Sequence, residues 1–159
     1  MRLSYSDHQK VYTLLSRDDI FWSARDGNQH LDDLQSYING LLLNRNAYLL
    51  MPEEGMIFFF WPINSVTDEM HVAMETGKRG KAGFKGVVAA VAWLFNNTKC
   101  ESLMTYIPEH HQPAIMFAAQ CGFRKKGKLE KSFFYDDGLQ DLFIFGATKE
   151  ELFNYYGVK

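Results

Sequence analysis

The sequence lacks what several classes of protein require. It has only two cysteines, Cys100 and Cys121, too few for a secreted disulfide framework and without the spacing of metal ligands. No run of about 18 apolar residues could span a membrane, and the N-terminus carries no signal-peptide pattern. The motifs of a zinc protease and of an acyl-enzyme serine are also absent. These absences predict a cytoplasmic protein with buried, reduced thiols, no bound metal and no membrane partner.

What the chain does contain is enough apolar material for one packed domain over residues 1–159, since 47% of the residues are hydrophobic. Its charge is unevenly distributed. Residues 1–77 hold 5 Lys/Arg and 11 Asp/Glu, residues 78–131 hold 10 and 3, and residues 132–159 hold 2 and 5. A basic region of this limited extent suits a small polyanion better than a nucleic acid, so no nucleic-acid partner is expected.

The most informative segment, residues 67–95, joins a strand, a basic turn and a helix. In the strand, Glu69 and His71 alternate with Met70, Val72 and Met74, the period of two that is typical of a half-buried strand. Polar side chains on one face of such a strand are candidates for chemistry. The alternative is that His71 is an ordinary structural residue.

The turn over residues 77–83 holds three glycines and three basic residues, and apolar residues then recur at helical spacing from Phe84 to Phe95. Glycine allows a phosphate to approach the backbone closely, and the free N–H groups at a helix start bind anions. The turn therefore predicts a phosphate site. The competing interpretation is a solvated basic loop between two core elements.

Periodicity and turn signals predict the whole order of elements. They are a strand at 1–6, helices at 8–20 and 31–42, strands at 47–51, 56–61 and 67–75, a helix from 84, a strand at 101–107, a helix at 113–121, strands at 123–134 and 139–145, and a helix at 148–156. Asp137-Gly138 favours a hairpin turn, and Thr148 with Glu151 favours a capping box. This order predicts an α+β fold with a mixed α/β sheet.

Two patterns in the second half of the chain are specific enough to compare with known families. The turn reads RGKAGF from Arg79 to Phe84, and a later segment begins with HQPA at His111 and closes with Gly122-Phe123. They resemble the Q/R-x-x-G-x-G/A turn and the N-x-x-A helix of the GNAT superfamily of acyl-CoA-dependent N-acetyltransferases. The segments GKRGKAG, YIPEHHQPA and AAQCGF together look like GNAT-like proteins of tailed bacteriophages.

The resemblance implies a mostly antiparallel central sheet, flanked by helices, whose fourth and fifth strands splay apart to admit acetyl-CoA as co-substrate. The pantetheine arm would pair with the backbone of Val72 and Met74, much as an added strand would. His111 would hydrogen-bond an amide of CoA. The residues implied for the diphosphate are Arg79, Gly80, Lys81, Ala82 and Gly83.

Acetyl transfer to a primary amine needs a base, a polarised thioester and a proton for the thiolate. His71 and Glu69 are the implied bases, and Tyr106 and ordered water are the candidate proton donors. Ala118 stands where the family often has a tyrosine, and Ala82 and Phe84 replace glycine or small residues in the turn. These departures support an alternative, an inactive GNAT-fold protein that serves in assembly, for example of a phage virion.

The acceptor is expected to be an amine on a small molecule or a protein, and the acidic N-terminal portion hints at a cationic one. Phe21, Trp22, Phe60 and Trp61 either line its cleft or belong to the core. A homodimer and phage structural proteins are the further partners considered. If the chain is phage-encoded, its expected location is the host cytoplasm or the virion.

Overall fold

The computed structural model describes residues 2–20 and 30–158, so the predictions for Phe21 and Trp22 lie outside the described residues. Within this part, one sheet has the strand order β1-β2-β3-β4-β6-β5. Its strands are β1 (Tyr48–Leu50), β2 (Met56–Pro62), β3 (Thr67–Met74), β4 (Ser102–Pro108), β5 (Arg124–Tyr135) and β6 (Gly138–Thr148). The helices include α1 (His8–Leu15), α3 (Leu34–Leu43), α4 (Lys81–Asn97), α5 (Gln112–Gln120) and α6 (Lys149–Tyr156), with 3-10 turns η1 (Tyr5–Asp7), η2 (Leu31–Asp33) and η3 (Thr76–Lys78).

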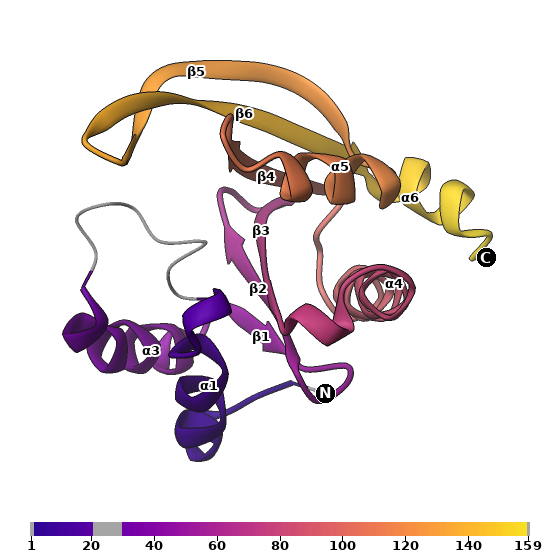
Figure 1. The fold of residues 1–159 in the computed structure, drawn as a ribbon. Coiled ribbons are helices and arrows are strands. Elements are labelled where there is room, and N and C mark those ends of the chain that lie inside the picture. Colours follow the sequence, from indigo (N-terminus) through magenta and orange to yellow (C-terminus); the bar gives the residue numbers. More distant parts are fainter. Residues whose placement is uncertain (1, 21–29, 159) are drawn as a thin grey trace.

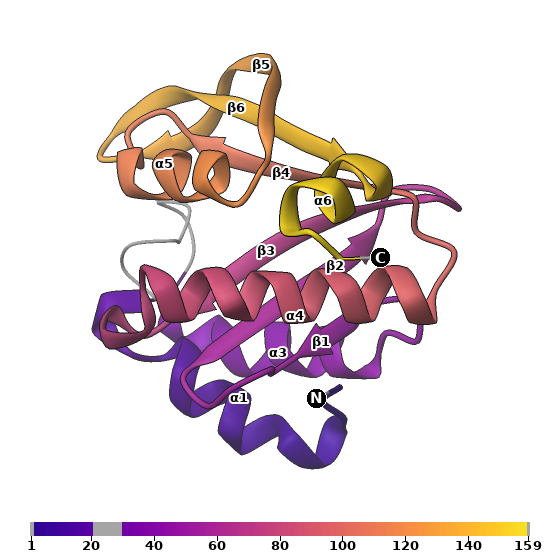
Figure 2. The ribbon, with the colours of Figure 1, turned by 90° about the vertical axis from the view of Figure 1, so that its right-hand side faces the viewer.

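Helices cover both faces of the sheet. In Figures 1 and 2, α4, α5 and α6 lie on one side, and α1 and α3 lie on the other. Strand β2 shows why both sides are covered, because Phe58 and Phe60 pack into the core under α4 while Ile57 and Phe59 pack into a second core under α1 and α3. A strand that is apolar on both faces must be buried on both.

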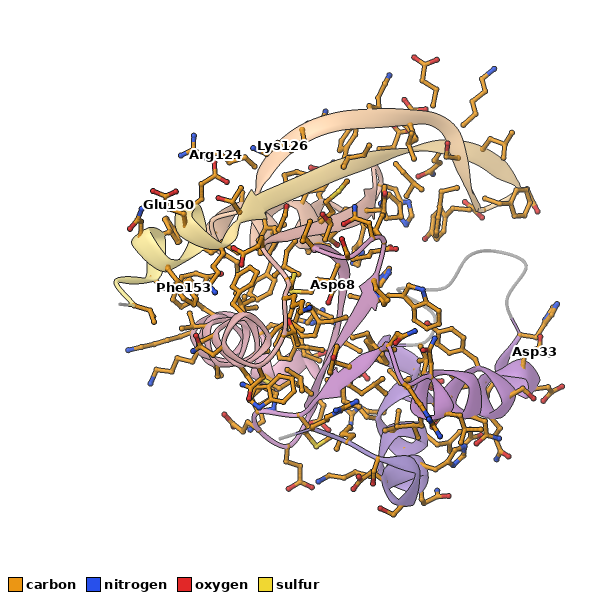
Figure 3. The ribbon with its side chains drawn as sticks, turned by 180° about the vertical axis from the view of Figure 1, so that it is seen from behind. Asp33, Asp68, Arg124, Lys126, Glu150 and Phe153 are labelled. Atoms are coloured by element: carbon orange, nitrogen blue, oxygen red, sulfur yellow. The ribbon has the colours of Figure 1, made fainter. Side chains whose placement is uncertain are left out.

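The sheet is divided into two halves that diverge. Strand β3 pairs with β4 in parallel only from Thr67–Ser102 to Glu69–Met104, although both strands continue for several residues. Figure 1 shows β1, β2 and β3 separating from β4, β6 and β5 beyond this short contact. Figure 3 shows Asp68, which belongs to the paired stretch, between the two halves. All pairs except β3–β4 are antiparallel, which confirms the predicted fold class and the splay.

The C-terminal elements closely follow the sequence. Thr148 and Glu151 form the predicted capping box at the start of α6. From α6, Phe153 reaches α4 and packs edge-on against Phe95, at 5.7 Å between ring centroids (Figure 3). The tip of the β5–β6 hairpin has Asp136 and Asp137 at positive φ, as a tight hairpin turn requires.

The predicted strand at residues 1–6 is wrong. Arg2 forms an isolated bridge with Leu50, and the chain then enters η1. The cause is local, because Ser4 donates its backbone N–H to the carboxylate of Asp7 at 2.8 Å and so closes a turn. None of the described helices is long and apolar enough to cross a membrane.

Candidate functional site

The open edge of β3 exposes backbone groups to the space between the two halves of the sheet. Across β2 and β3, hydrogen-bonded and non-hydrogen-bonded pairs of residues alternate. The bond from Glu75 N–H to the Gly55 carbonyl (2.9 Å) shows that Gly55 and Glu75 form a bonded pair, so every second pair from there is bonded as well. Val72 and Met74 therefore direct their N–H and C=O groups away from β2. No described strand pairs with that edge beyond Glu69, so these groups are free to pair with an extended ligand.

A cavity of about 500 Å³ occupies this space. It is bordered by β3, by the end of β4, by the start of α4 and by α5. Of the residues predicted for the site, those that line it are His71, Val72, Met74, Arg79, Gly80, Tyr106 and His111. Its volume and its mostly apolar wall are typical of a small-molecule site.

The start of α4 presents backbone amides with no protein acceptor. The first helical bond runs from Phe84 N–H to the Gly80 carbonyl at 2.9 Å. Within the described part of the chain, no acceptor is found for the N–H groups of Gly80, Lys81, Ala82 and Gly83. Gly80 has φ 81°, a conformation that strains other residues, so glycine is needed there for the backbone rather than for space.

Of these four residues only Gly80 borders the cavity, and the other three continue from it into the helix. Gly83 also has a packing role that the sequence did not indicate. A Cβ at this position would lie 2.9 Å from the sulfur of Met74, so the absence of a side chain lets α4 approach β3. Phe84 packs against the main core and against Tyr156, edge to face at 5.8 Å, which accounts for a bulky residue in place of a small one.

The turn before α4 is fastened to the chain segment after α1. The carboxylate of Asp19 accepts hydrogen bonds from the hydroxyl of Thr76 at 2.8 Å and from Arg17 Nε at 3.0 Å. These bonds lower the pKa of Asp19 to about 2, and the bond from Thr76 has the largest effect. Arg79 donates from Nη2 to the Asp19 carbonyl at 3.3 Å, which places its guanidinium at the cavity. Sequence patterns gave no signal for this link, because the partners are far apart in the chain.

On the α3 side of β3, Glu69 and His71 form a direct pair. His71 Nε2 lies 2.6 Å from Glu69 Oε1, and the side chains are 52% and 24% exposed. A carboxylate that accepts from Nε2 leaves Nδ1 of a neutral imidazole as the basic nitrogen. His71 lines the cavity, whereas Glu69 does not and acts on it through His71.

The remaining candidates lie on the β4 side. Tyr106 is half-buried and lines the cavity. His111 precedes α5, and burial, the neighbouring His110 and then Arg79 lower its pKa. It is therefore a neutral ring that can donate or accept a hydrogen bond. Ala118 is buried in the cavity wall and supplies no hydroxyl.

Other parts of the cavity wall were missed by the sequence analysis. They include Ile20, Thr105, Phe117 and Phe133. Phe133 follows an irregularity in the pairing of β5 with β6, between Leu129 and Phe133. Of the aromatic residues considered for an acceptor cleft, Phe60 is fully buried core, whereas Trp61 is 41% exposed.

Metal and thiol chemistry find no support here. No cluster of three or more His, Cys, Asp or Glu residues that could hold a metal occurs in residues 2–20 and 30–158. Burial raises the pKa of Cys100 to about 11 and that of Cys121 to about 12, so both are buried, protonated thiols at neutral pH.

A sheet that opens between two parallel neighbours, with a helix N-terminus at the opening, defines the fold of the GNAT acetyltransferases. Solved structures agree. The spermidine N-acetyltransferase of Vibrio cholerae in complex with CoA and spermine superposes with a TM-score of 0.76 at 16% identity, over 97% of this chain and 96% of that one. A chimera of the same enzyme gives 0.77 at 15% identity, over 97% and 96%. At such identities the likeness establishes the fold.

The sequence comparisons are sparser. No protein-family model matches the chain. Protein p31 of Acyrthosiphon pisum secondary endosymbiont phage 1 is 26% identical over 116 residues, which are 71% of this chain and 75% of the phage protein. This relative agrees with the likeness to bacteriophage proteins seen in the sequence.

Proposed function

We propose that this protein is an N-acetyltransferase that transfers an acetyl group from acetyl-CoA to a primary amine. The observation that carries the proposal is the coincidence of three features at one cavity. They are the unpaired edge of β3, the amides without acceptors at the start of α4, and a carboxylate–imidazole pair. An extended pantetheine, a diphosphate and an amine require these three features, and the Vibrio cholerae enzyme of the same fold is solved in complex with CoA and spermine.

The residues present fit acetyl-CoA. Val72 and Met74 offer N–H and C=O groups to the pantetheine amides, as an added strand would receive them. The amides of residues 80–83 and the guanidinium of Arg79 hold the diphosphate, and Lys81 adds a positive charge there. His111 is placed to bond an amide of the cofactor. When bound, acetyl-CoA supplies an activated thioester.

In this proposal, side chains of the protein accept and donate the protons of the reaction. A primary alkyl amine has a pKa near that of lysine, about 10.4, so it arrives protonated at neutral pH. His71 accepts a proton through Nδ1, while Glu69 holds Nε2 and fixes the ring. The amine nitrogen forms a bond to the acyl carbon as the bond from that carbon to sulfur breaks, and its second proton then replaces the one that Tyr106 gives to the sulfur. Tyr106 supplies the proton that the sulfur requires, in place of the tyrosine that Ala118 replaces.

The structure also bears on the inactive alternative. A protein that kept the fold only as a scaffold would have no need of unpaired amides at an open cavity or of an imidazole held by a carboxylate. We therefore take acetyl transfer as the function and assembly as the outcome to be tested against it.

Binding is tested by thermal melting with millimolar CoA. If CoA is present at 100 times its Kd, the native state gains about 2.7 kcal/mol, which raises the Tm of a chain of this size by about 5 to 10 °C. Lys81→Glu reverses an exposed charge at the start of α4 and should weaken binding about tenfold, which halves the gain. Lys99→Glu makes the same change beyond the far end of α4 and should melt with CoA like the wild type.

Activity is tested by mass spectrometry of amine products after incubation with acetyl-CoA. The acceptors include spermidine, because the similar enzyme is named for it. N-acetylated amine at rates well above those of His71→Ala supports the proposal. A protein that binds CoA and acetylates no amine in the panel contradicts it, and absence of any CoA-dependent shift in Tm contradicts the binding site as well.

A further inference from the structure

Two exposed aromatic side chains lie next to the proposed catalytic pair on the α3 face of the sheet. Trp61 on β2 is directly opposite Glu69 on β3. Side chains of such partners point to the same face with Cβ atoms about 5 Å apart. Trp61 shares that face with Ile57 and Phe59, yet unlike them it is 41% exposed, because it lies beyond the apolar core under α3.

Tyr37 borders the same place from the helix above it. Leu34, Ile38 and Leu41 bury one side of α3 against the sheet, and Tyr37 lies on the flank of that helix with 54% of its surface exposed. Desolvation raises the pKa of the Tyr37 hydroxyl, and the charge of Glu69 raises it further.

Glu69 can accept a further hydrogen bond besides the one from His71. Its Oε1 contacts His71 Nε2, and its Oε2 has no partner in the part of the chain that the structure describes. A carboxylate opposite Trp61, on the sheet face that α3 covers and on which Tyr37 is exposed, is a setting that attracts a cation, through both its charge and the faces of the rings.

The distribution of charge over the molecule favours the same ligand. The α3 face is built from residues 1–77, in which acidic side chains exceed basic ones by 11 to 5. Figure 3 places Asp33 at the start of α3, whereas Arg124 and Lys126 lie on the opposite side of the molecule. A cation approaching the α3 face thus meets a negative surface, and CoA is drawn to the basic start of α4.

We propose that Tyr37, Trp61 and Glu69 form a subsite for a second cationic group of the acceptor, so that the protein prefers diamines and polyamines to monoamines. The proposal rests on the function above and deepens it. Glu69 Oε1 contacts His71 Nε2, which leaves Oε2 of the carboxylate and Nδ1 of the ring for the two nitrogens of a diamine.

The test compares two acceptors that differ by one charge, 1,4-diaminobutane and butylamine, by their kcat/KM values at saturating acetyl-CoA. We expect the wild type to prefer the diamine by about tenfold or more. Tyr37→Leu and Trp61→Leu should each lower this preference about two- to fivefold, since an exposed cation–π contact contributes about 0.5 to 1 kcal/mol. Tyr155→Leu, the same change at an exposed tyrosine on α6, should keep the full preference.

The outcomes separate this proposal from the one on which it rests. Transfer to both amines with no preference for the diamine, or a preference that persists in both variants, overturns the subsite and leaves acetyl transfer intact. Absence of transfer to either amine overturns both. The shift in Tm with CoA shows that each variant is folded, and if Trp61→Leu does not fold, Tyr37→Leu on the helix flank decides alone.

Discussion

The two faces of β3 carry opposite kinds of chemistry. Toward α4, Met70 and Met74 belong to the apolar core, and the nearby polar groups are backbone amides at a helix start. Toward α3, the same strand shows Glu69 and His71. In the proposed function, an anionic cofactor and a cationic acceptor therefore approach from opposite sides of the sheet. They can meet only where the sheet is open, beyond the short pairing of β3 with β4.

The helices on the two faces also differ in where they place a glycine, because Gly86 of α4 is buried and Gly40 of α3 is exposed. A Cβ at Gly86 of α4 would lie 2.3 Å from the sulfur of Met56 and 3.3 Å from the ring of Phe58, both fully buried. A Cβ at Gly40 of α3 would meet nothing within 4 Å. Close packing of Gly86 against β2 and of Gly83 against Met74 of β3 fixes the start of α4 on the sheet, which suits a site proposed to hold a diphosphate in one position.

The largest expected effect on activity comes from removing the proposed base on the α3 face. His71→Ala should lower kcat/KM for amine acetylation about 100-fold, the lower end of what general bases contribute. The shift in Tm with CoA should not change, because the cofactor is held from the other face. Steady-state kinetics and melting on the same preparation check both halves. Wild-type kcat/KM in His71→Ala would exclude it as the base.

Substitution of Glu69 should have a smaller effect on kcat, and a conservative substitution should restore most of the loss. Glu69→Ala frees the His71 ring and should lower kcat about tenfold with a monoamine acceptor. Glu69→Gln keeps an oxygen that can accept from Nε2 and should recover most of that loss. If Gln and Ala are equally impaired, orientation of His71 through Nε2 is not the role of Glu69, and its charge is what matters.

Two glycine variants test the difference in packing. Gly86→Ala should lower the free energy of unfolding by about 1 kcal/mol, because the strain against Met56 exceeds the gain in helix propensity. Gly40→Ala should raise it by about the same amount, since the site is exposed and helical. Urea denaturation measures both values. Equal signs for the two changes would contradict the packing difference.

The smallest expected effect concerns the fastening of the basic turn. The pKa of Asp19 is about 2 in the folded state against an ordinary 3.8, because Thr76 and Arg17 bond its carboxylate. A lowered pKa stabilises the fold above about pH 4, and this contribution is lost as pH falls toward 2. Asp19→Asn should therefore make the fall of Tm between pH 4 and pH 2 shallower. Asp18→Asn, the same change one residue earlier, is the control, and equal slopes in both variants would deny Asp19 this role.

Much of this fold could be predicted because its signals are local. The alternation around His71, the glycines before α4 and the pairing of Thr148 with Glu151 each lie within a few residues of sequence, and the structure contains each as expected. The failed strand at residues 1–6 is instructive. Its residues suited a strand, but the bond between Ser4 and Asp7 favours a turn, and only the bridge of Arg2 remains.

The candidate site was predictable only in part, because its assembly depends on long-range contacts. No pattern in the sequence indicates that Thr76 meets Asp19, that Tyr37 approaches Glu69, or that Phe133 reaches the cavity. They depend on how the segment after α1, the helix α3 and the β5–β6 hairpin lie over the sheet. The family resemblance indicated that the turn and the strand belong to the site, but it could not indicate which distant residues lie next to them.

The most direct test of the account is hydrogen exchange at the amides of residues 80–83, followed by NMR with and without saturating CoA. The free protein should exchange them rapidly, since no described group accepts their hydrogen bonds. CoA should slow them at least tenfold, together with Val72 and Met74, while the amides of β1 keep their rates. Binding of CoA with no change at residues 80–83 would contradict the placement of the diphosphate, and with it the proposed site.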